Sequence, residues 1–242
     1  MMKTTTRKII GLLTGLMLTV SVHAQTIPST GNSPKAFVPA GWKIIQQSAG
    51  DLNKDGLADV AMIIENTDKR NIHKNPDLGA DTLNLNPRWL IILFQQPGGS
   101  YQLSVVNKKL IPSENDAESP CLEDPLGEGA DTLIMKGVLS ISFHYFMSCG
   151  SYESSSSTYV FRYQHQHFEL IGMDTESYSR ASGEMEQNSI NFSTGKRSYT
   201  HGGNMFEESK NKPVTEWHTL KDHAIRVLDN FSADDLQDLR EQ

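Results

Sequence analysis

The segment from Asp51 to Asp59, Asp-Leu-Asn-Lys-Asp-Gly-Leu-Ala-Asp, constrains the chain more than any other. Its first, third, fifth and ninth residues carry side-chain oxygens and its seventh offers a backbone carbonyl: Asp51, Asn53, Asp55, Asp59 and Leu57. Gly56 can take the backbone angles of a tight turn that a residue with a Cβ resists. Oxygen ligands in this order are those that Ca²⁺ prefers, so the loop predicts a calcium site. The alternative is a solvated turn without metal, because Asp, Asn and Gly favour turns in any case.

The residues on both sides of this loop indicate strands. An EF-hand needs a bidentate Glu at position 12 and a helix on each side, whereas position 12 here is Met62. Residues 42–46 and 60–64 are short segments rich in β-branched side chains, which is typical of strands. The stretch from Gly50 to Val60 resembles the strand–loop–strand calcium motif of FG-GAP and VCBS repeats, as found in integrin-type β-propellers. The resemblance implies that the same five loop residues bind the ion, Leu57 through its carbonyl.

Residues 1–24 have the parts of a cleavable signal peptide. Lys3, Arg7 and Lys8 give a positive start. The apolar run at 9–20 is followed by Val22 and Ala24, which supply small residues at the −3 and −1 positions of a cleavage site. This run is shorter than the roughly 20 apolar residues that span a bilayer, and no cysteine near the cleavage point could carry a lipid. We therefore expect removal of this segment and a periplasmic or extracellular location.

Charge narrows the choice of partners. The sequence holds 22 Lys and Arg against 29 Asp and Glu, for a net charge of −7. Removal of the signal peptide would make the chain more acidic, because the charged residues of that segment are all basic. Such a chain lacks the basic surface that phosphate binding needs, which excludes nucleic acid, and anionic lipid would repel it. No later segment is apolar enough to be a transmembrane span. A cation, an envelope protein or a carbohydrate is the kind of partner that suits it.

The only two cysteines, Cys121 and Cys149, are expected to form a disulfide in an oxidising compartment. Neither has a local His or Cys at ligand spacing, so a metal site or a cysteine nucleophile is disfavoured.

Hydrophobic patterning predicts an all-β, mainly antiparallel fold that is propeller-like or sandwich-like, with a short C-terminal helix. Residues 25–36 are polar and predict a flexible leader, and 37–242 a single β-rich domain. Beyond the loop flanks, strands are expected at 88–94, 101–106, 138–146, 159–163, 167–172 and 189–193. The serine-rich run Ser151–Ser157 is expected to be a turn. Ser232–Leu239 has an N-cap serine, early acids and leucines three apart, which indicates the helix.

Two other segments allow more than one interpretation. Gly79–Leu83 and Gly129–Leu133 share the sequence Gly-Ala-Asp-Thr-Leu, and their spacing would fit a propeller blade or a duplicated unit, or chance. Residues 112–131 carry seven acids and no base. Long loops are often binding elements, whereas an acidic run is more commonly only solvated.

Catalytic motifs are scarce. Candidate paired carboxylates are Asp174 with Glu176 and Glu184 with Glu186, but their spacing alone also fits surface charge. His165 and His167 could share a metal, although a solvated pair is the more ordinary reading. Residues 159–172 and 189–196 are similar to secreted proteins of Gram-negative bacteria without assigned activity. We therefore predict a calcium-binding, non-enzymatic binding or interaction protein, with a carbohydrate- or peptide-acting hydrolase as the alternative.

Overall fold

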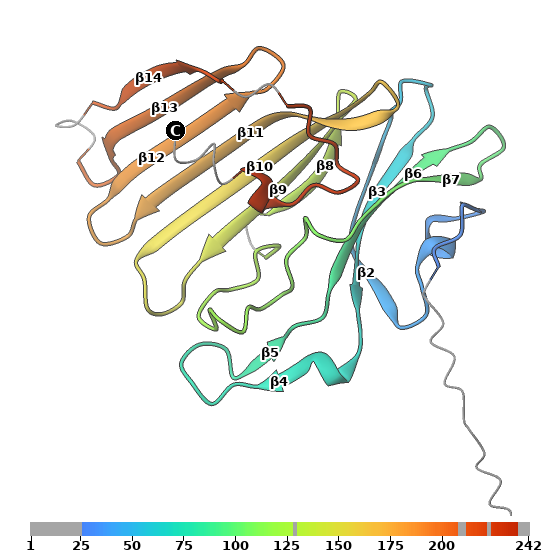
Figure 1. Ribbon diagram of the computed structural model, residues 1–242. Helices are drawn as coiled ribbons and strands as arrows, with labels where there is room; N and C mark the ends of the chain where they lie inside the picture. The colour runs from blue at the N-terminus through green and yellow to red at the C-terminus, as the bar shows by residue number, and fades with distance from the viewer. Residues whose placement is uncertain (1–25, 128–129, 208–211, 222–223, 237–242) are drawn as a thin grey trace, which may run out of the picture.

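The computed structural model describes residues 26–127, 130–207, 212–221 and 224–236 (Figure 1). The predicted signal peptide at 1–24 lies outside the described residues. Within them every regular element is a strand or a short 3₁₀ helix, and all strand pairs are antiparallel. The all-β, antiparallel class is thus confirmed, in its sandwich-like form. No helix in the described part of the chain is long and apolar enough to cross a membrane.

The first sheet has five strands in the order β1-β7-β6-β3-β2. Its strands are β1 (Thr30–Gly31), β2 (Trp42–Gly50), β3 (Asp59–Asn66), β6 (Arg88–Gln95) and β7 (Tyr101–Asn107). Strand β3 is buried along almost its whole length because both of its faces are covered. Ala61 and Ile63 pack into the main core between the sheets. Val60 and Met62 pack on the opposite side, in a second apolar cluster.

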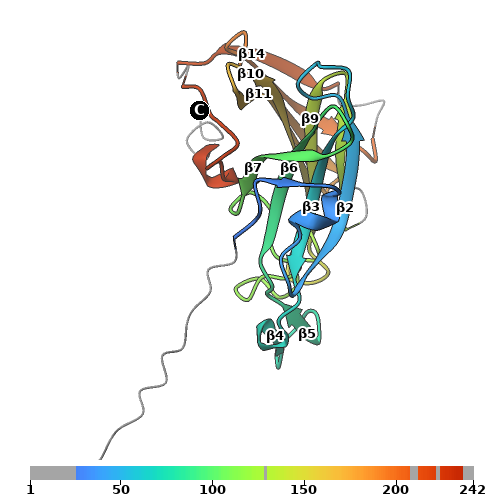
Figure 2. The same ribbon diagram turned by 90° about the vertical axis from the view of Figure 1, so that its right-hand side faces the viewer.

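The N-terminal segment covers this second cluster. Residues 26–36, expected to be a flexible leader, include β1 and the start of the 3₁₀ helix η1 (Pro34–Phe37). Phe37 is fully buried against the outer face of the five-stranded sheet. In the side view, this segment lies along that face (Figure 2).

The second sheet has seven strands in sequence order from β8 to β14. They are β8 (Asp131–Met135), β9 (Val138–Phe146), β10 (Glu153–Gln164), β11 (His167–Ser179), β12 (Glu184–Asn191), β13 (Lys196–Asn204) and β14 (Val214–Thr219). One face supplies apolar side chains to the main core, among them Ile141, Tyr159 and Met173. The other face is polar and faces solvent.

The prediction of a turn at Ser151–Ser157 was wrong, because β10 already begins at Glu153. This stretch pairs with β9 on one side and with β11 on the other. Its backbone groups are thereby satisfied in the ladder, and pairing overrides the preference of serine for turns. Ser154 and Ser157 are even buried.

The two Gly-Ala-Asp-Thr-Leu segments occupy different places. The first leads into β5 (Thr82–Asn84), which pairs only with β4 (Ile72–Lys74) in a small ribbon that follows the 3₁₀ helix η2 (Lys69–Asn71). This ribbon projects from one end of the molecule (Figures 1 and 2). The second segment contributes β8, at the edge of the seven-stranded sheet. The repeat in sequence therefore does not mark equivalent structural units.

The C-terminal segment closes the core. Its predicted helix is a single 3₁₀ turn, η3 (Ala233–Leu236), and residues 237–242 lie outside the described residues. The Phe231 ring lies 5.6 Å from that of Tyr159 and 5.4 Å from that of Phe161. The buried Asn107 amide donates to the carbonyls of Leu228 and Phe231, which ties this segment to β7.

The long acidic loop is held by a buried arginine. Arg88, on β6, is 3% exposed, and its Nε donates to Glu65 at 2.7 Å. Its two terminal nitrogens donate to both oxygens of Asp124, at 2.6 and 2.9 Å. The backbone of Glu123 then bonds to Phe146 on β9. Glu114 also lies 3.8 Å from the Arg88 guanidinium, so two acids of the run are ion-pair partners and not merely solvated.

The predicted disulfide joins Cys121 and Cys149, whose Cα atoms lie 5.3 Å apart. It connects the acidic loop to the segment that follows β9, beside a hydrogen bond from the Ser148 amide to the Cys121 carbonyl.

Replacing both cysteines with serine should lower the free energy of unfolding by about 3–4 kcal/mol, because the bridge shortens a loop in the unfolded chain. Urea unfolding of the variant and of the oxidised wild type measures the difference. Equal midpoints and slopes for the two proteins would contradict a structural role for the bridge.

Replacing Arg88 with Met should cost about 3–5 kcal/mol, because it leaves the buried Glu65 with only the half-exposed Lys43 as a counter-charge. Burial alone would raise the pKa of Glu65, but hydrogen bonds from Lys43 and Arg88 outweigh it and hold that pKa below 4.5. Glu65 thus stabilises the fold above its unfolded-state pKa, and this contribution is lost as the pH falls through its folded-state pKa.

Chemical denaturation at pH 7 measures the stability lost in Arg88→Met. Repeating it below pH 4.5 measures how much of the contribution of Glu65 disappears in acid. The matched control is Arg70→Met, because Arg70 pairs with Asp68 at an exposed site and should contribute nothing measurable. If the Arg88 variant were no less stable than this control, the network would not support the fold.

Candidate functional site

The predicted calcium loop connects β2 to β3. Gly56 has φ +85° and Lys54 has φ +66°, so two of its residues take the left-handed conformation. The glycine was anticipated from the sequence, and the left-handed lysine was not. Leu52, within the loop, is fully buried in the main core and anchors the turn.

The exposed half of the loop is organised by its own side chains. Asp51 accepts from the amides of Lys54 and Gly56, at 2.6 and 3.0 Å. Asn53 accepts from the amide of Asp55 at 3.0 Å, and Asp55 from that of Leu57 at 2.8 Å. Each oxygen that accepts one such bond keeps a further lone pair. The loop is therefore pre-shaped, with oxygens still able to bind a cation.

Asp59 plays a different part from the other carboxylates. It is fully buried, and its oxygens accept from the amides of Leu52 at 2.8 Å, Asn53 at 3.3 Å and Gln95 at 3.0 Å. Burial raises its pKa, these three hydrogen bonds oppose the shift, and the charge of Asp55 adds to it, so the pKa lies above 3.8. Asp59 clamps the two ends of the loop to β6.

The loop carboxylates are not drawn into one tight cluster. Across the described ranges, no three His, Cys, Asp or Glu side chains gather closely enough to hold a metal ion. Asp51, Asn53, Asp55 and Leu57 share one turn, whereas Asp59 is engaged below it by backbone amides. A five-ligand calcium site thus remains a prediction.

The loop lies where the two sheets meet. A Cβ on Gly137, in the β8–β9 turn, would be 3.6 Å from Lys54 and 3.7 Å from the Asp51 carbonyl. The backbone amide of Ile134 on β8 donates to the Ser48 hydroxyl on β2 at 3.1 Å. Order in the loop and order at the junction between the sheets are therefore linked.

No protein-family model, curated protein or solved structure matches the chain. The resemblance to FG-GAP and VCBS motifs is therefore carried by the loop residues alone.

A second candidate surface is the solvent-facing side of the seven-stranded sheet. Cross-strand partners share a face, and two rows of partners run across six strands here. The first row is Ser142, Thr158, Asp174, Ser189, Ser198 and Trp217. The second row is His144, Ser156, Glu176, Gln187, Thr200 and Thr215. We call these two rows the polar band.

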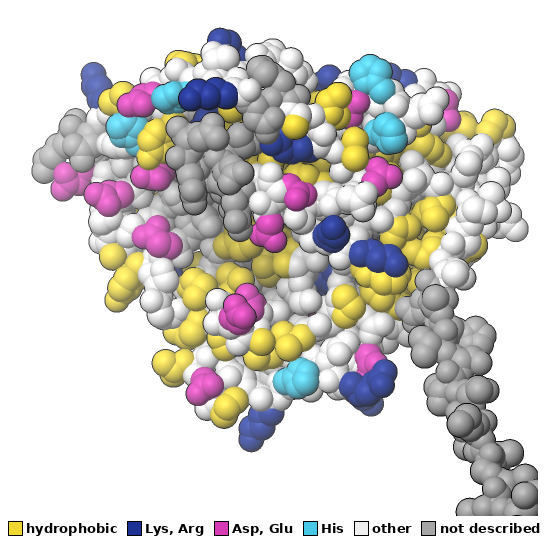
Figure 3. Space-filling view, in the orientation of Figure 1, with side chains coloured by type: hydrophobic (Ala, Val, Ile, Leu, Met, Phe, Trp, Pro, Cys, Tyr) yellow, Lys and Arg dark blue, Asp and Glu magenta, His cyan; other side chains and the backbone are white. Residues whose placement is uncertain are grey.

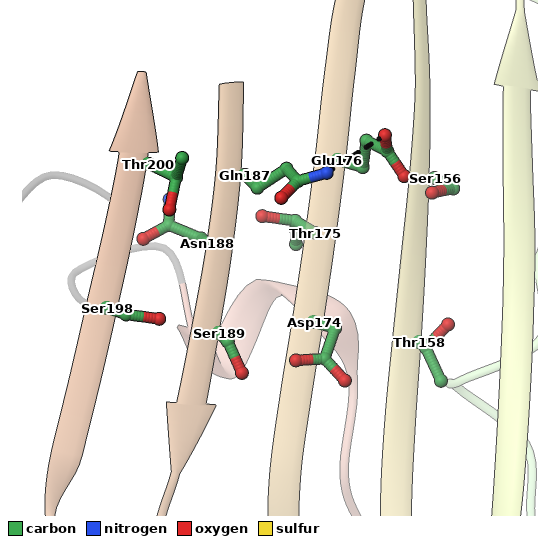
Figure 4. Close-up of a pocket in the computed structure, with 10 residues that line it drawn as sticks. All are labelled: Ser156, Thr158, Asp174, Thr175, Glu176, Gln187, Asn188, Ser189, Ser198 and Thr200. Atoms are coloured by element: carbon green, nitrogen blue, oxygen red, sulfur yellow. Dashed lines mark hydrogen bonds between the residues drawn. The ribbon is translucent and has the colours of Figure 1, made fainter. Parts of the chain in front are cut away.

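The middle of the polar band forms a pocket of about 300 Å³, to which Thr175 and Asn188 also contribute (Figure 4). The Gln187 amide donates to Glu176 at 3.2 Å across it. A second pocket of about 360 Å³ adjoins His144, with Phe146, Tyr178 and the acidic loop around it.

The structure places the predicted carboxylate pairs in different settings. Asp174 and Glu176 are exposed within the polar band, and Glu184 and Glu186 line a separate pocket with Tyr199 and His201. None of these carboxyls is enclosed in apolar surroundings of the kind that makes a general acid. The sequence suggested the pairs but not the rows, because the rows depend on strand register.

The two predicted histidines lie at the hairpin that joins β10 to β11, where His165 is one of the two turn residues and His167 is the first residue of β11. His165 has φ +50°, and its Nδ1 lies 2.9 Å from a Glu169 oxygen. Burial would raise the pKa of Glu169, but hydrogen bonds from Gln164 and His165 outweigh this and lower it. His165 is therefore engaged by a carboxylate at the protein surface.

Replacing Asp59 with Ala in calcium-free buffer should lower the free energy of unfolding by about 2–3 kcal/mol, because buried amides of the loop and of Gln95 lose their acceptor. The control is Asp51→Ala, whose amide partners can turn to water, with an expected loss under about 1 kcal/mol. Urea denaturation in EDTA compares them. Equal losses would show that Asp59 is not the clamp.

Proposed function

We propose that this chain is an exported, calcium-stabilised β protein that works by binding and not by catalysis. The observation that carries the proposal is the loop from Asp51 to Asp59, shaped by its own side chains and lying at the junction of the two sheets. A cation there would bridge Asp51, Asn53, Asp55, Asp59 and the Leu57 carbonyl. Its binding would stiffen both sheets at the point where they meet.

The carboxylates of the loop support a cation by their charge. Asp59 has a raised pKa, so the folded protein binds a proton at this carboxyl more readily than the unfolded chain does. Ionisation of Asp59 therefore costs stability as the pH rises through its folded-state pKa. A bound Ca²⁺ would stabilise the ionised form and offset that cost. Calcium binding should accordingly weaken as the pH falls.

A binding role is also supported by the surface. Acidic side chains are spread among basic ones over the face seen in Figure 3, without one dominant patch. The disulfide fits an oxidising compartment such as the periplasm or the extracellular space. The exposed setting of Asp174 and Glu176 favours ligand contact over hydrolysis.

Calcium at millimolar concentration should raise the melting temperature by about 2–8 °C over EDTA, since extracellular loops bind at about 10⁻⁴–10⁻³ M and contribute about 1–2 kcal/mol. Asp55→Ala should abolish this rise, because it removes a ligand without emptying the core. Differential scanning calorimetry measures the shift.

The matched control is Asp77→Ala, which removes an exposed acid from the β4–β5 ribbon and should keep the full calcium response. Wild-type protein that melts at one temperature in EDTA and in excess calcium would refute the proposed ion.

A further inference from the structure

We infer that the polar band binds a neutral carbohydrate chain laid across the strands of the seven-stranded sheet. This inference rests on the proposed role as an exported binding protein and names its ligand class. The band lies opposite the core side, because Thr158 and Asp174 alternate with the buried Tyr159 and Met173. Strands β9 to β14 carry it, and at a spacing of about 4.8 Å it extends over about 24 Å. A chain of several sugar units fits that length better than one sugar does.

The chemistry of the polar band matches sugar hydroxyls. Its side chains end in hydroxyl, amide, carboxylate or ring groups, which offer donors and acceptors over one surface. Several are already paired: Ser142 with Thr158 at 2.9 Å, and Thr200 with Thr215 at 2.9 Å. Because these hydroxyl groups are already held in fixed orientations, less conformational entropy is lost when a ligand binds. Because most side chains are short, the middle of the band is hollowed and not covered by long charged chains (Figure 4).

The charge of the polar band favours an uncharged polysaccharide over an anionic one. The carboxylates of the two rows are Asp174 and Glu176, and neither row contains Lys or Arg. A polymer bearing uronate, sulfate or phosphate groups would meet like charge within the two rows. The cation in the neighbouring row of this face, Lys196, already donates to the Thr219 hydroxyl at 3.0 Å. Sugar hydroxyls can instead donate to these two carboxylates, which accept strong hydrogen bonds.

Aromatic side chains stand at both ends of the band. Trp217, at the end of the first row, is 71% exposed, although a large indole is normally buried. At the other end, Phe146 on β9 borders the pocket beside His144, with the Arg180 guanidinium 4.2 Å from the centre of its ring. Tyr178, on β11, lines the same pocket. The apolar faces of sugar rings stack on such rings, while ring hydroxyls reach polar neighbours. This arrangement of hydrogen-bonding centre and aromatic ends is the observation that favours carbohydrate over a basic peptide.

Native gel electrophoresis of the purified protein in millimolar calcium, with soluble polysaccharide cast in the gel, tests the inference. The probes are three neutral polymers, a β-glucan, a galactomannan and a xylan, and anionic polygalacturonate. At least one neutral polymer should retard the protein, and polygalacturonate should not. Oligolysine, titrated by calorimetry, should give no heat of binding at physiological salt.

Two variants locate the site. Ser189→Arg fills the middle of the band and should abolish the retardation, whereas Ser193→Arg, the same change on the exposed β12–β13 turn, should leave it intact. Trp217→Ala should weaken binding about tenfold through lost stacking. Thermal melts confirm that each variant is folded.

Several results would overturn the inference: no retardation by any of the neutral polymers, binding of polygalacturonate or oligolysine in their place, or unchanged retardation of Ser189→Arg. Running Asp55→Ala in the same gels separates the two proposals. This variant should still be retarded, although its melting temperature no longer responds to calcium. Wild-type protein that is retarded but shows no calcium-dependent melting shift would reject the ion and keep the carbohydrate site. Wild-type protein that shows the melting shift but no retardation would keep the ion and reject the carbohydrate site.

Discussion

The buried guanidinium of Arg88 is the interaction on which the arrangement of the two sheets depends. It joins β6 to β3 through Glu65 and reaches Asp124 in the loop that leads to the second sheet. Asp124 in turn accepts from the Leu126 amide, so its position also fixes the local course of the loop. Charge burial of this kind contributes little net stability, but it penalises any arrangement that separates the partners. Arg88 therefore selects one register between the acidic loop and the strands beside it.

The fold class could be predicted because hydrophobic alternation is a local property. Arg88–Gln95 and Val138–Phe146 read as strands from their own residues, and both are strands. The composition of Ser151–Ser157 did not indicate a strand, because its strand conformation comes from pairing with strands on both sides. The order of strands in the sheets, and the partnership of Arg88 with Asp124, join residues far apart in sequence. Such pairings have no signature in a single chain without relatives to compare.

In the candidate sites, too, the features that depend on local sequence were predictable and those that depend on strand pairing were not. The turn around Gly56 was predictable because the hydrogen bonds accepted by Asp51, Asn53 and Asp55 join residues close in sequence. The burial of Asp59 was not, because it depends on the Gln95 amide from another strand. The polar band is wholly a product of register. Ser189 and Trp217 are ordinary residues in the sequence and become neighbours in one row only through Ser198 between them.

Gly50, the last residue before the loop, lies against β8. A Cβ there would be 2.6 Å from Cγ2 of Ile134 and 3.3 Å from its carbonyl oxygen. Gly50 does not have a left-handed φ, so glycine is needed here because there is no space for a side chain, and not because of its backbone freedom. A larger residue at this position would require a smaller one at position 134, and the two substitutions would be strongly non-additive. A point of direct contact between the two sheets is thus also a place where the sequence can change only in pairs.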